Sequence, residues 1–281
     1  MKKYLLFGLI SIFLISFCKS GNSSTDPKNP EIPTPPGYHL TWHDEFDLPM
    51  IDLTKWEHEV NARGGGNNEL QYYTNRLINS FIENGQLVIR GLKEHYTGNE
   101  GIREYTSARL ITKNKGDWKY GRFEIKAKLP QGQGIWPAIW MMPTENMYGG
   151  WAASGEIDIM EFLGHELNKV YGTLHYGGSY PQNVYTGDNF VLPQGTFHED
   201  FHVFAIEWDT TSISWFVDDS LYQTQTHWHS TNGTYPAPFD QRFFLILNVA
   251  IGGNWPGNPD ATTTFPQEMI VDYVRVFQKE E

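Results

Sequence analysis

The chain has 281 residues, long enough to bury a full hydrophobic core as one large all-β domain or as two smaller domains. Aromatic residues make up 15% of it and charged residues only 19%, a composition that suits a globular protein and excludes a disordered or coiled-coil one. The formal net charge of −12 argues against nucleic acid as a partner, because phosphate binders gain affinity from Lys and Arg. We therefore expect a globular protein with an uncharged partner.

The start of the chain has the pattern of an export signal. Lysines precede an apolar run, Leu5 to Phe17, that is too short to span a bilayer as a helix. Cys18 follows at once, as in the lipobox where bacterial lipoproteins are cleaved and acylated, with the bulky Phe17 in place of the usual small residue. We predict a signal peptide over residues 1–18 and lipidation at Cys18; the alternative is an ordinary cleaved signal. The mature protein would be a lipoprotein at the bacterial cell surface or periplasm, or otherwise secreted.

A linker separates this signal from the rest of the chain. Residues 19–37 are rich in Ser, Asn and Pro with almost nothing to bury, which predicts an extended tether. From Tyr38 onward there is no second linker and no repeat, so residues 38–281 are predicted to form one domain. We expect a monomer that meets a membrane only through the lipid anchor.

The domain is predicted to consist of strands. Residues 122–129 alternate polar and apolar side chains, which is typical of a half-buried strand, and residues 212–222 predict a hairpin that turns near Asp218–Asp219. Residues 242–253 and 269–277 are apolar on both faces, as inner strands would be. No segment of helical length keeps a period of 3.6. We predict an all-β fold, an antiparallel two-sheet β-sandwich of the jelly-roll kind with a concave substrate cleft.

Three carboxylates interrupt an apolar strand in "SGEIDIMEFLG", residues 154–164. Buried charge is costly unless it is paired, bound to metal or used chemically. Because side chains alternate along a strand, Glu156 and Asp158 share a face whereas Glu161 points the other way. A β-bulge adds one residue and would return Glu161 to the same face. We therefore predict a bulge at or near Ile159–Met160.

With that bulge the two glutamates could approach the separation of about 5–5.5 Å that retaining glycoside hydrolysis requires. One glutamate would attack as a carboxylate and the other would donate a proton, while Asp158 would orient the attacking group. Two alternatives remain open from the residues alone. The three acids could ligate Ca²⁺, or they could form a structural network satisfied by Arg and backbone donors.

The motif "GEIDIMEF" resembles the signature of glycoside hydrolase family 16, in the bulged form of the laminarinases, which are endo-1,3-β-glucanases. The resemblance implies a β-jelly roll and a retaining mechanism without a cofactor, with Glu156 as nucleophile, Asp158 as its helper and Glu161 as acid/base. Ala152 stands where many relatives have Pro. Further similar stretches are "WHDEFD" (42–47), "GNNELQYYT" (66–74), "YTSARL" (105–110), "YGRFEIKAKLPQGQGIWPAIWMMP" (120–143), "GTLHYG" (172–177), "FHVFAIEW" (201–208), "NVAIGGNWPG" (248–257) and "VDYVRVF" (271–277).

Three tryptophans are candidate platforms for sugar rings. A sugar has an apolar face with hydroxyl groups at its edge, so a glycan cleft combines flat aromatic rings with hydrogen-bonding groups. Trp136, Trp140 and Trp255 lie in segments marked by Gly and Pro, and the resemblance implies positions along the cleft. Taken singly, a Trp is more often a core residue than a sugar platform.

Three polar residues are further candidates for substrate binding. Arg109 and Asn67 can bind sugar hydroxyls, and His175 can lie beside the acid/base. The alternatives are a structural Arg pair, a turn Asn and a core histidine with its hydrogen bonds satisfied.

The resemblance also implies one structural Ca²⁺ far from the cleft. Relatives hold it through positions that correspond to Glu45, a backbone carbonyl at Gly85, and Asp272. Oxygen ligands suit Ca²⁺, but a hydrogen-bonded pair would satisfy Asp272 equally well.

Together these features predict a retaining endo-β-1,3-glucanase that hydrolyses laminarin-like polysaccharide. The alternatives within the enzyme class are a hydrolase of mixed-linkage β-glucan and a hydrolase of an agarose-type galactan. From other classes, the alternatives are a noncatalytic surface glycan-binding protein and a Ca²⁺-dependent adhesion module.

Overall fold

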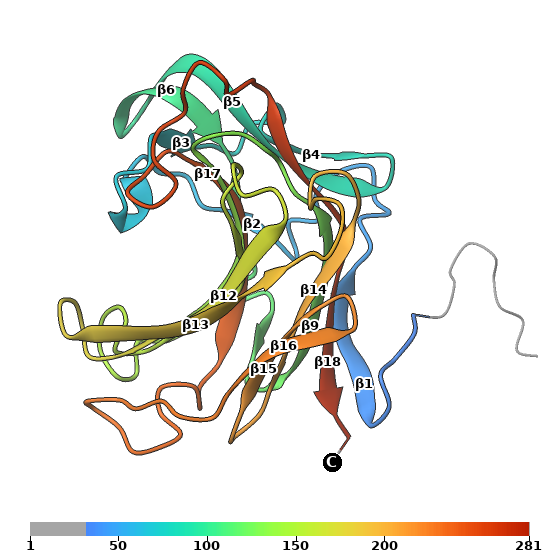
Figure 1. Ribbon diagram of the computed structural model, residues 1–281, viewed down its shortest axis with the longest axis vertical. Helices are drawn as coiled ribbons and strands as arrows, with labels where there is room; N and C mark the ends of the chain where they lie inside the picture. Colours follow the sequence, from blue (N-terminus) through green and yellow to red (C-terminus); the bar gives the residue numbers. More distant parts are fainter. Residues whose placement is uncertain (1–31, 281) are drawn as a thin grey trace, which may run out of the picture. The chain divides into compact units, whose positions relative to one another are not determined.

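The computed structural model describes residues 32–280 (Figure 1). The predicted signal peptide, the lipidation site Cys18 and most of the predicted linker lie outside the described residues. Contacts along the chain group Thr34–Glu281 into one compact unit, which is described here by itself. The predicted boundaries at residues 18 and 37 stay predictions.

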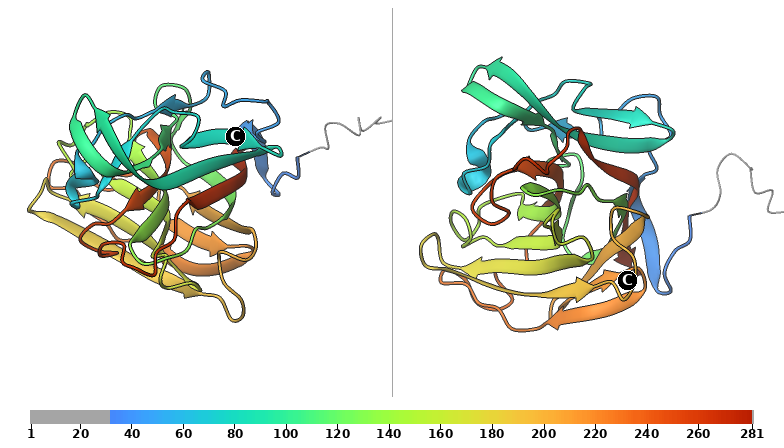
Figure 2. Two further views of the ribbon diagram at one scale, coloured as in Figure 1. Left: turned by 90° about the horizontal axis from the view of Figure 1, so that it is seen from above. Right: turned by 45° about the horizontal axis from the view of Figure 1, so that its top comes forward.

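Two β-sheets pack face to face in this unit (Figures 1 and 2). The ten-stranded sheet runs in the order β16-β15-β14-β9-β18-β5-β6-β3, with β1 paired to β18 and β4 to β5. Its strands are β1 Tyr38–Asp44, β3 Gln71–Tyr73, β4 Ser80–Glu83, β5 Gln86–Gly98, β6 Gly101–Ser107, β9 Gly121–Lys128, β14 His202–Trp208, β15 Ile213–Val217, β16 Ser220–Gln225 and β18 Gln267–Lys279.

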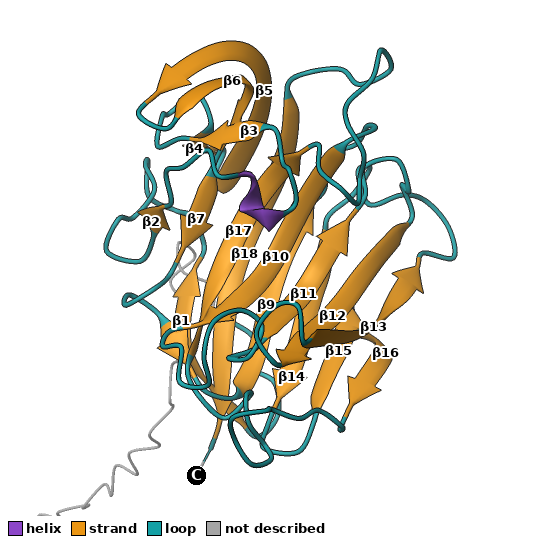
Figure 3. Cartoon of the chain, turned by 90° about the vertical axis from the view of Figure 1, so that its left-hand side faces the viewer, coloured by secondary structure: helices purple, strands orange, loops and turns teal. Residues whose placement is uncertain are grey.

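The eight-stranded sheet runs in the order β13-β12-β11-β10-β17-β7-β2, with β8 paired to β17. Figure 3 views the molecule from the side of this sheet. Its strands are β2 Glu57–His58, β7 Arg109–Ile111, β8 Asp117–Trp118, β10 Ile135–Pro143, β11 Glu156–Phe162, β12 Lys169–Gly177, β13 Asn183–Val191 and β17 Phe243–Ile251.

This architecture confirms the predicted all-β sandwich. Within residues 32–280 the only helical element is the 3₁₀ turn Gly64–Gly66, and no helix there has the length and apolar character to cross a bilayer. Every strand pair of the described chain is antiparallel except β3 with β6. The parallel pair is three residues long and lies at the end of its sheet, so it leaves the sandwich architecture unchanged.

The individual strand predictions are confirmed with one difference. Strand β9 alternates buried and half-buried residues, the β15–β16 hairpin turns at Asp218 and Asp219, and every residue of β17 is buried. Strand β18 is an inner strand, but its outer face is only half-buried, so the expectation of two equally apolar faces is wrong. Its half-buried positions include Asp272 and Arg275, which form ion pairs on the outside of the sandwich.

Large apolar side chains fill the space between the sheets. Trp56, Trp208 and Trp215 are at most 2% exposed, and they join aliphatic and Phe residues from both layers in one continuous core. Burying a large apolar side chain contributes about 1.5–3 kcal/mol, so this core is the main source of the fold's stability. It also fixes the outer face of the eight-stranded sheet, from which polar and aromatic side chains project.

Candidate active site

The three acids of the sequence motif lie on β11, at the middle of the eight-stranded sheet between β10 and β12. Asp158 pairs with Thr173 and Glu161 with Tyr171, so β11 has one residue more than β12 between these pairs. On the other side, Met160 pairs with Ile139 and Asp158 with Trp140, which leaves Ile159 as the extra residue. The predicted bulge is therefore confirmed.

Because of the bulge, the three acids of β11 lie on one face of the strand and its core residues on the other. Ile157, Ile159 and Met160 are at most 2% exposed and belong to the core, whereas the three acids line a cleft on the opposite face. The indole N–H of Trp215, from the ten-stranded sheet, donates to the backbone carbonyl of Asp158 at 2.8 Å. The second layer of the sandwich thus holds the bulged backbone in place.

The cleft has a volume of about 980 Å³. It is lined by all nine residues that the sequence predicted as catalytic or substrate-binding: Asn67, Arg109, Trp136, Trp140, Glu156, Asp158, Glu161, His175 and Trp255. Because these residues come from four strands and two loops, only the folded chain brings them together.

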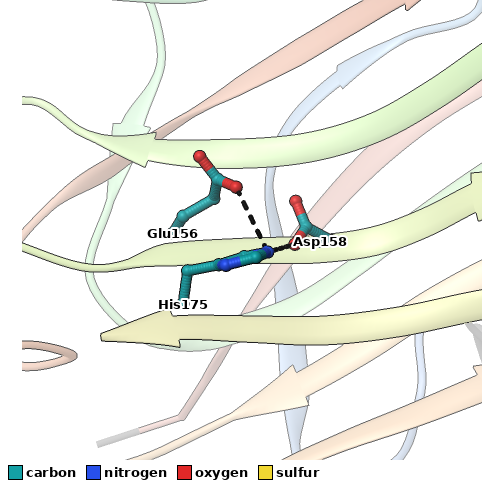
Figure 4. A group of neighbouring side chains, drawn as sticks. All are labelled: Glu156, Asp158 and His175. Carbon is teal, nitrogen blue, oxygen red and sulfur yellow. Dashed lines mark ion pairs between the residues drawn. The ribbon is translucent and has the colours of Figure 1, made fainter. Parts of the chain in front are cut away.

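Glu156 lies at the start of β11 and is held from two sides. The Trp151 indole N–H donates to its Oε2 at 2.8 Å, and His175 Nε2 lies 3.7 Å from its Oε1 (Figure 4). Burial and the neighbouring Asp158 raise the pKa of Glu156 to about 8, whereas His175, Trp151 and Arg109 act to lower it. Both contacts favour the charged form of this carboxyl over the neutral one.

Asp158 is almost fully buried, with 3% of its surface exposed. Its Oδ2 lies 3.4 Å from His175 Nε2 and has no hydrogen-bond partner among the described residues. Burial raises the pKa of Asp158 above its ordinary value, so the protonated form is favoured next to a charged Glu156.

The direct contacts of His175 are with Glu156 and Asp158, and His175 also acts to lower the pKa of Glu161, the acid/base candidate beside which the sequence analysis placed it. The reason for the direct contacts is the strand register, because His175 on β12 pairs directly with Glu156, whereas the residue opposite Glu161 is Tyr171. The His175 ring also contacts Trp151 and Tyr185, with ring centroids 5.5 and 5.8 Å apart.

Glu161 lies beside Trp136, in the cleft that Trp255 and Tyr171 also line. Burial raises the pKa of Glu161 well above its ordinary value, and the carboxyls of Asp158 and Glu156 raise it further. Trp136 and Trp255 meet edge to face beside it, at 5.6 Å, and Tyr171 packs against Trp255 at 5.0 Å. This environment keeps a proton on Glu161, as a general acid requires.

A second group of side chains lines the cleft on the other side of β11. The Arg109 guanidinium lies 4.6 Å from the Trp140 ring, and the Trp140 N–H donates to Asn248 Oδ1 at 2.7 Å. Asn248 donates in turn to the Tyr73 hydroxyl at 3.1 Å. Hydrogen bonds thus fix the orientation of the Trp140 ring as a flat surface beside the acids.

The cleft residues that sequence reasoning missed include Tyr73, Trp151, Tyr171, Tyr185 and Asn248. Trp151 lies five residues before Glu156, next to Ala152, and this closeness was its only signal. Tyr73 and Asn248 lie within the stretches "GNNELQYYT" and "NVAIGGNWPG", whereas Tyr171 and Tyr185 sit in strands with no distinctive spacing to the motif.

The residues predicted to bind calcium lie outside the cleft, and their carboxylates have other partners. Arg275 donates to both oxygens of Glu45, at 3.0 and 2.8 Å. Gln86 donates to one oxygen of Asp272 and Lys126 pairs with the other, at 3.2 and 2.9 Å. Since all four carboxylate oxygens are paired, this arrangement does not fit a calcium ion without rearrangement, and the ion stays a prediction.

A two-sheet sandwich with clustered carboxylates in an aromatic-lined cleft defines a glycoside hydrolase of the jelly-roll class. Residues 79–275 match the family model "Glycosyl hydrolases family 16", and the chain belongs to that family. Enzymes of this family need no cofactor for catalysis.

Curated relatives and solved structures agree with this membership. The chain is 46% identical over 255 residues to a beta-glucanase of Rhodothermus marinus, covering 86% of each. It is 40% identical over 269 residues to glucan endo-1,3-beta-glucosidase A1 of Niallia circulans, covering 89% of this chain but only 39% of that protein. The catalytic domain of a laminarinase from Thermotoga petrophila superposes with a TM-score of 0.78 at 45% identity, covering 87% of this chain and 99% of that domain.

Proposed function

We propose that the chain is a retaining endo-β-1,3-glucanase that hydrolyses laminarin-like polysaccharide as a monomer. The observation that carries the proposal is the position of Glu156, Asp158 and Glu161 on one face of a bulged strand, inside an aromatic-lined cleft. The laminarinase and endo-1,3-β-glucosidase names of the similar proteins support the choice of substrate.

In the proposed first step, ionised Glu156 attacks the anomeric carbon while Glu161 gives its proton to the departing glycosidic oxygen. The different surroundings of the two glutamates support these roles. Burial and Asp158 raise the pKa of Glu156 to about 8, and His175, Trp151 and Arg109 act against this shift and favour the charged form. The pKa of Glu161 is raised well above its ordinary value by burial and by the two neighbouring carboxyls.

In the second step, Glu161 as carboxylate takes a proton from water, and the water oxygen displaces Glu156 from the sugar. The configuration at the anomeric carbon is retained because it is inverted twice. Asp158, protonated between the two glutamates, would donate a hydrogen bond to Glu156 and relieve the repulsion that three charged carboxyls would create.

The charges of the cleft favour an uncharged polymer over a sulfated one. Among the described residues that line the cleft, the arginines are Arg63 and Arg109, and each is already paired with a carboxylate, Glu100 and Glu59 respectively. The remaining charged groups are mostly acids, which repel sulfate. This balance supports a neutral β-glucan.

The first experiment is incubation with laminarin, lichenan and agarose, followed by mass spectrometry and anomeric NMR of the products. Laminarin oligomers of mixed size that appear first as β-anomers are expected. Preferential cleavage of lichenan or agarose would instead favour mixed-linkage glucan or galactan. Binding without cleavage of any polymer would overturn the enzyme assignment in favour of a surface glycan-binding protein.

We also propose export and anchoring through Cys18, on the sequence pattern alone. Expression in a Gram-negative host with a Cys18→Ser variant beside the wild type tests it. The wild type is expected in the membrane fraction and the variant in the soluble periplasm or medium; the same distribution for both would contradict the anchor.

The predicted calcium at Glu45, Gly85 and Asp272 has a separate test. Thermal unfolding is measured in Ca²⁺ and in EGTA, and in an Asp272→Asn variant. Binding predicts a higher melting temperature in Ca²⁺ for the wild type only, because an ion that binds the native state alone stabilises it. Equal melting temperatures in Ca²⁺ and EGTA would contradict the ion.

A further inference from the structure

Two carboxylates and one imidazole converge within the cleft. One ligand atom from each of Glu156, Asp158 and His175 lies within 4.8 Å of the other two. His175 Nε2 is 3.4 Å from Asp158 Oδ2 and 3.7 Å from Glu156 Oε1, as the dashed lines in Figure 4 mark. In hydrolysis these carboxyls attack the sugar or hold a proton. The same three side chains also bring together the ligand atoms of a metal site.

An unsatisfied acceptor marks this point of the cleft. Only 3% of the surface of Asp158 is exposed, and its Oδ2 has no hydrogen-bond partner within residues 32–280. An acceptor that is buried in this way is costly unless a cation compensates it. A neutral His175 with its proton on Nδ1 would add a third lone pair, on Nε2, directed at the same point.

We propose that Glu156, Asp158 and His175 together bind one Zn²⁺ ion, and that the ion-bound form is catalytically inactive. The inference concerns the side chains alone and does not depend on which polysaccharide the enzyme cleaves.

The distances between the three side chains are close to those of a zinc site. Zinc lies about 2.0–2.2 Å from His nitrogen and carboxylate oxygen in tetrahedral sites, which places two ligands roughly 3.3–3.6 Å apart. His175 Nε2 lies 3.4 Å from Asp158 Oδ2 and 3.7 Å from Glu156 Oε1, close to this spacing, and all three ligand atoms lie within 4.8 Å of one another. The three residues line the open cleft, so water can complete a fourth position.

The ligand set distinguishes zinc from calcium. Ca²⁺ and Mg²⁺ prefer oxygen ligands, whereas an imidazole nitrogen favours Zn²⁺ and its transition-metal neighbours. The sequence-based alternative of three acids around Ca²⁺ differs from this group, because the third member is His175 and not Glu161.

The partner of Glu156 also favours binding, whereas His175 Nδ1 has no hydrogen-bond partner within the described residues. Trp151 donates to Glu156 Oε2 and thereby orients the other oxygen toward His175, the kind of outer-shell contact that fixes a metal ligand. The other histidines of the described chain that pair with a carboxylate each meet only one, as His95 does with Glu104 and His202 with Asp218. Within residues 32–280 this group is the only one of its kind.

Bound zinc would occupy the oxygen with which Glu156 attacks and would withdraw Asp158 from its role as a hydrogen-bond donor. Turnover would therefore stop while the ion is bound, and chelation would restore it. Zinc also has to displace protons from the carboxyls, so binding weakens as pH falls.

The test is calorimetric titration of Zn²⁺ into the full chain, with Cys18→Ser in every variant so that the thiol does not bind the ion. We expect one site in the parent protein and an affinity loss of about tenfold or more in His175→Gln, since even outer-shell partners are worth that much. The matched control His95→Gln removes an exposed histidine beside a single carboxylate, and it should bind zinc as the parent does.

A second variant and a second probe complete the test. Asp158→Asn keeps the size of the side chain and should lose affinity to a similar degree, so the result does not rest on the folding of His175→Gln. Co²⁺ bound in place of zinc should give the intense visible bands of a tetrahedral site, and these bands should be lost in both variants. Unchanged zinc affinity in both variants, or no one-to-one binding by the parent, would overturn the inference even if laminarin is cleaved.

Discussion

Trp151 and Glu156 are joined by a hydrogen bond of 2.8 Å in which the indole N–H donates to carboxylate Oε2. Trp151 belongs to the loop before β11, which is held by its own contacts: Ser154 Oγ accepts from the Tyr148 N–H, and the Tyr148 hydroxyl donates to Asp240. The loop therefore contributes a donor to the site that no strand could provide, and it links the charge of Glu156 to the conformation of residues 148–154.

We predict that Trp151→Phe lowers kcat by about 10–100-fold with a smaller effect on KM, because a hydrogen bond to a charged group is worth about 1.5–3 kcal/mol. The bond also lowers the pKa of Glu156, so its loss should move the acidic limb of the pH–rate profile to higher pH. Trp228→Phe, which removes an indole bond to the Pro236 carbonyl, is the control and should leave the profile in place. An unshifted acidic limb in Trp151→Phe would contradict the role of this bond.

Variants of the two glutamates should differ in whether they form the glycosyl-enzyme with an activated substrate. Glu161→Gln is expected to lose about 10²–10⁴-fold in turnover of laminarin, the usual contribution of general acid–base catalysis. With an aryl glycoside whose leaving group needs no proton, the glycosyl-enzyme should still form, and mass spectrometry should detect it on Glu156. Glu156→Gln should form none. A trapped sugar on Glu161 would reverse the assignment.

The cluster of three carboxyls should lower the free energy of unfolding at alkaline pH. The ordinary pKa of a Glu is 4.5, and that of Glu156 is raised to about 8, so between these values the unfolded chain has released protons that the folded chain still holds. Stability therefore falls as pH rises through this window. Glu161→Gln removes one of the interacting carboxyls and should gain on the order of 2 kcal/mol near pH 9 but little near pH 4.

Thermal unfolding of wild type and Glu161→Gln at both pH values checks this. Glu104→Gln is the control, because Glu104 is exposed and pairs only with His95. It should not share the pH-dependent gain. An equal effect of Glu161→Gln at both pH values would show that repulsion between ionised carboxyls is not the cause.

Trp140 should act on long substrates more than on short ones. Its ring is held by a hydrogen bond to Asn248 and lies against the Arg109 guanidinium, on the β10 side of Asp158. Replacing it by Ala should lower kcat/KM for long oligosaccharides by about tenfold, as expected for the loss of an aromatic contact and its buried area. Oligosaccharides too short to reach it serve as the internal control, and an equal loss for all lengths would contradict a distal binding surface.

Sequence could predict the chemistry of this site better than its contacts. The bulge could be predicted from the alternation of side chains along a strand, because only an added residue returns Glu161 to the face of Glu156. The partner of His175 did not follow, since it depends on the register between β11 and β12, which neither strand encodes alone. Trp151 was missed because its position comes from a loop, where no periodicity fixes the direction of a side chain.

The same limit explains the calcium residues. Glu45 and Asp272 carry the oxygen chemistry that the ion prefers, but their nearest partners, Arg275 and Lys126, come from positions that strand pairing alone brings close. For β18, the many apolar residues predicted two buried faces, whereas the charged residues lie on an outer face that is only half-buried.

Ile159 is the one residue by which β11 exceeds its neighbours, and its removal would leave Glu156, Asp158 and the next glutamate at strictly alternating positions, still on one face. A lineage could therefore gain or lose this codon without ever scattering its carboxylates. What such a change would disturb is the carbonyl of Asp158 and its bond to Trp215, on the opposite layer. Proteins with and without this residue would then differ at positions of the ten-stranded sheet, which contact no sugar.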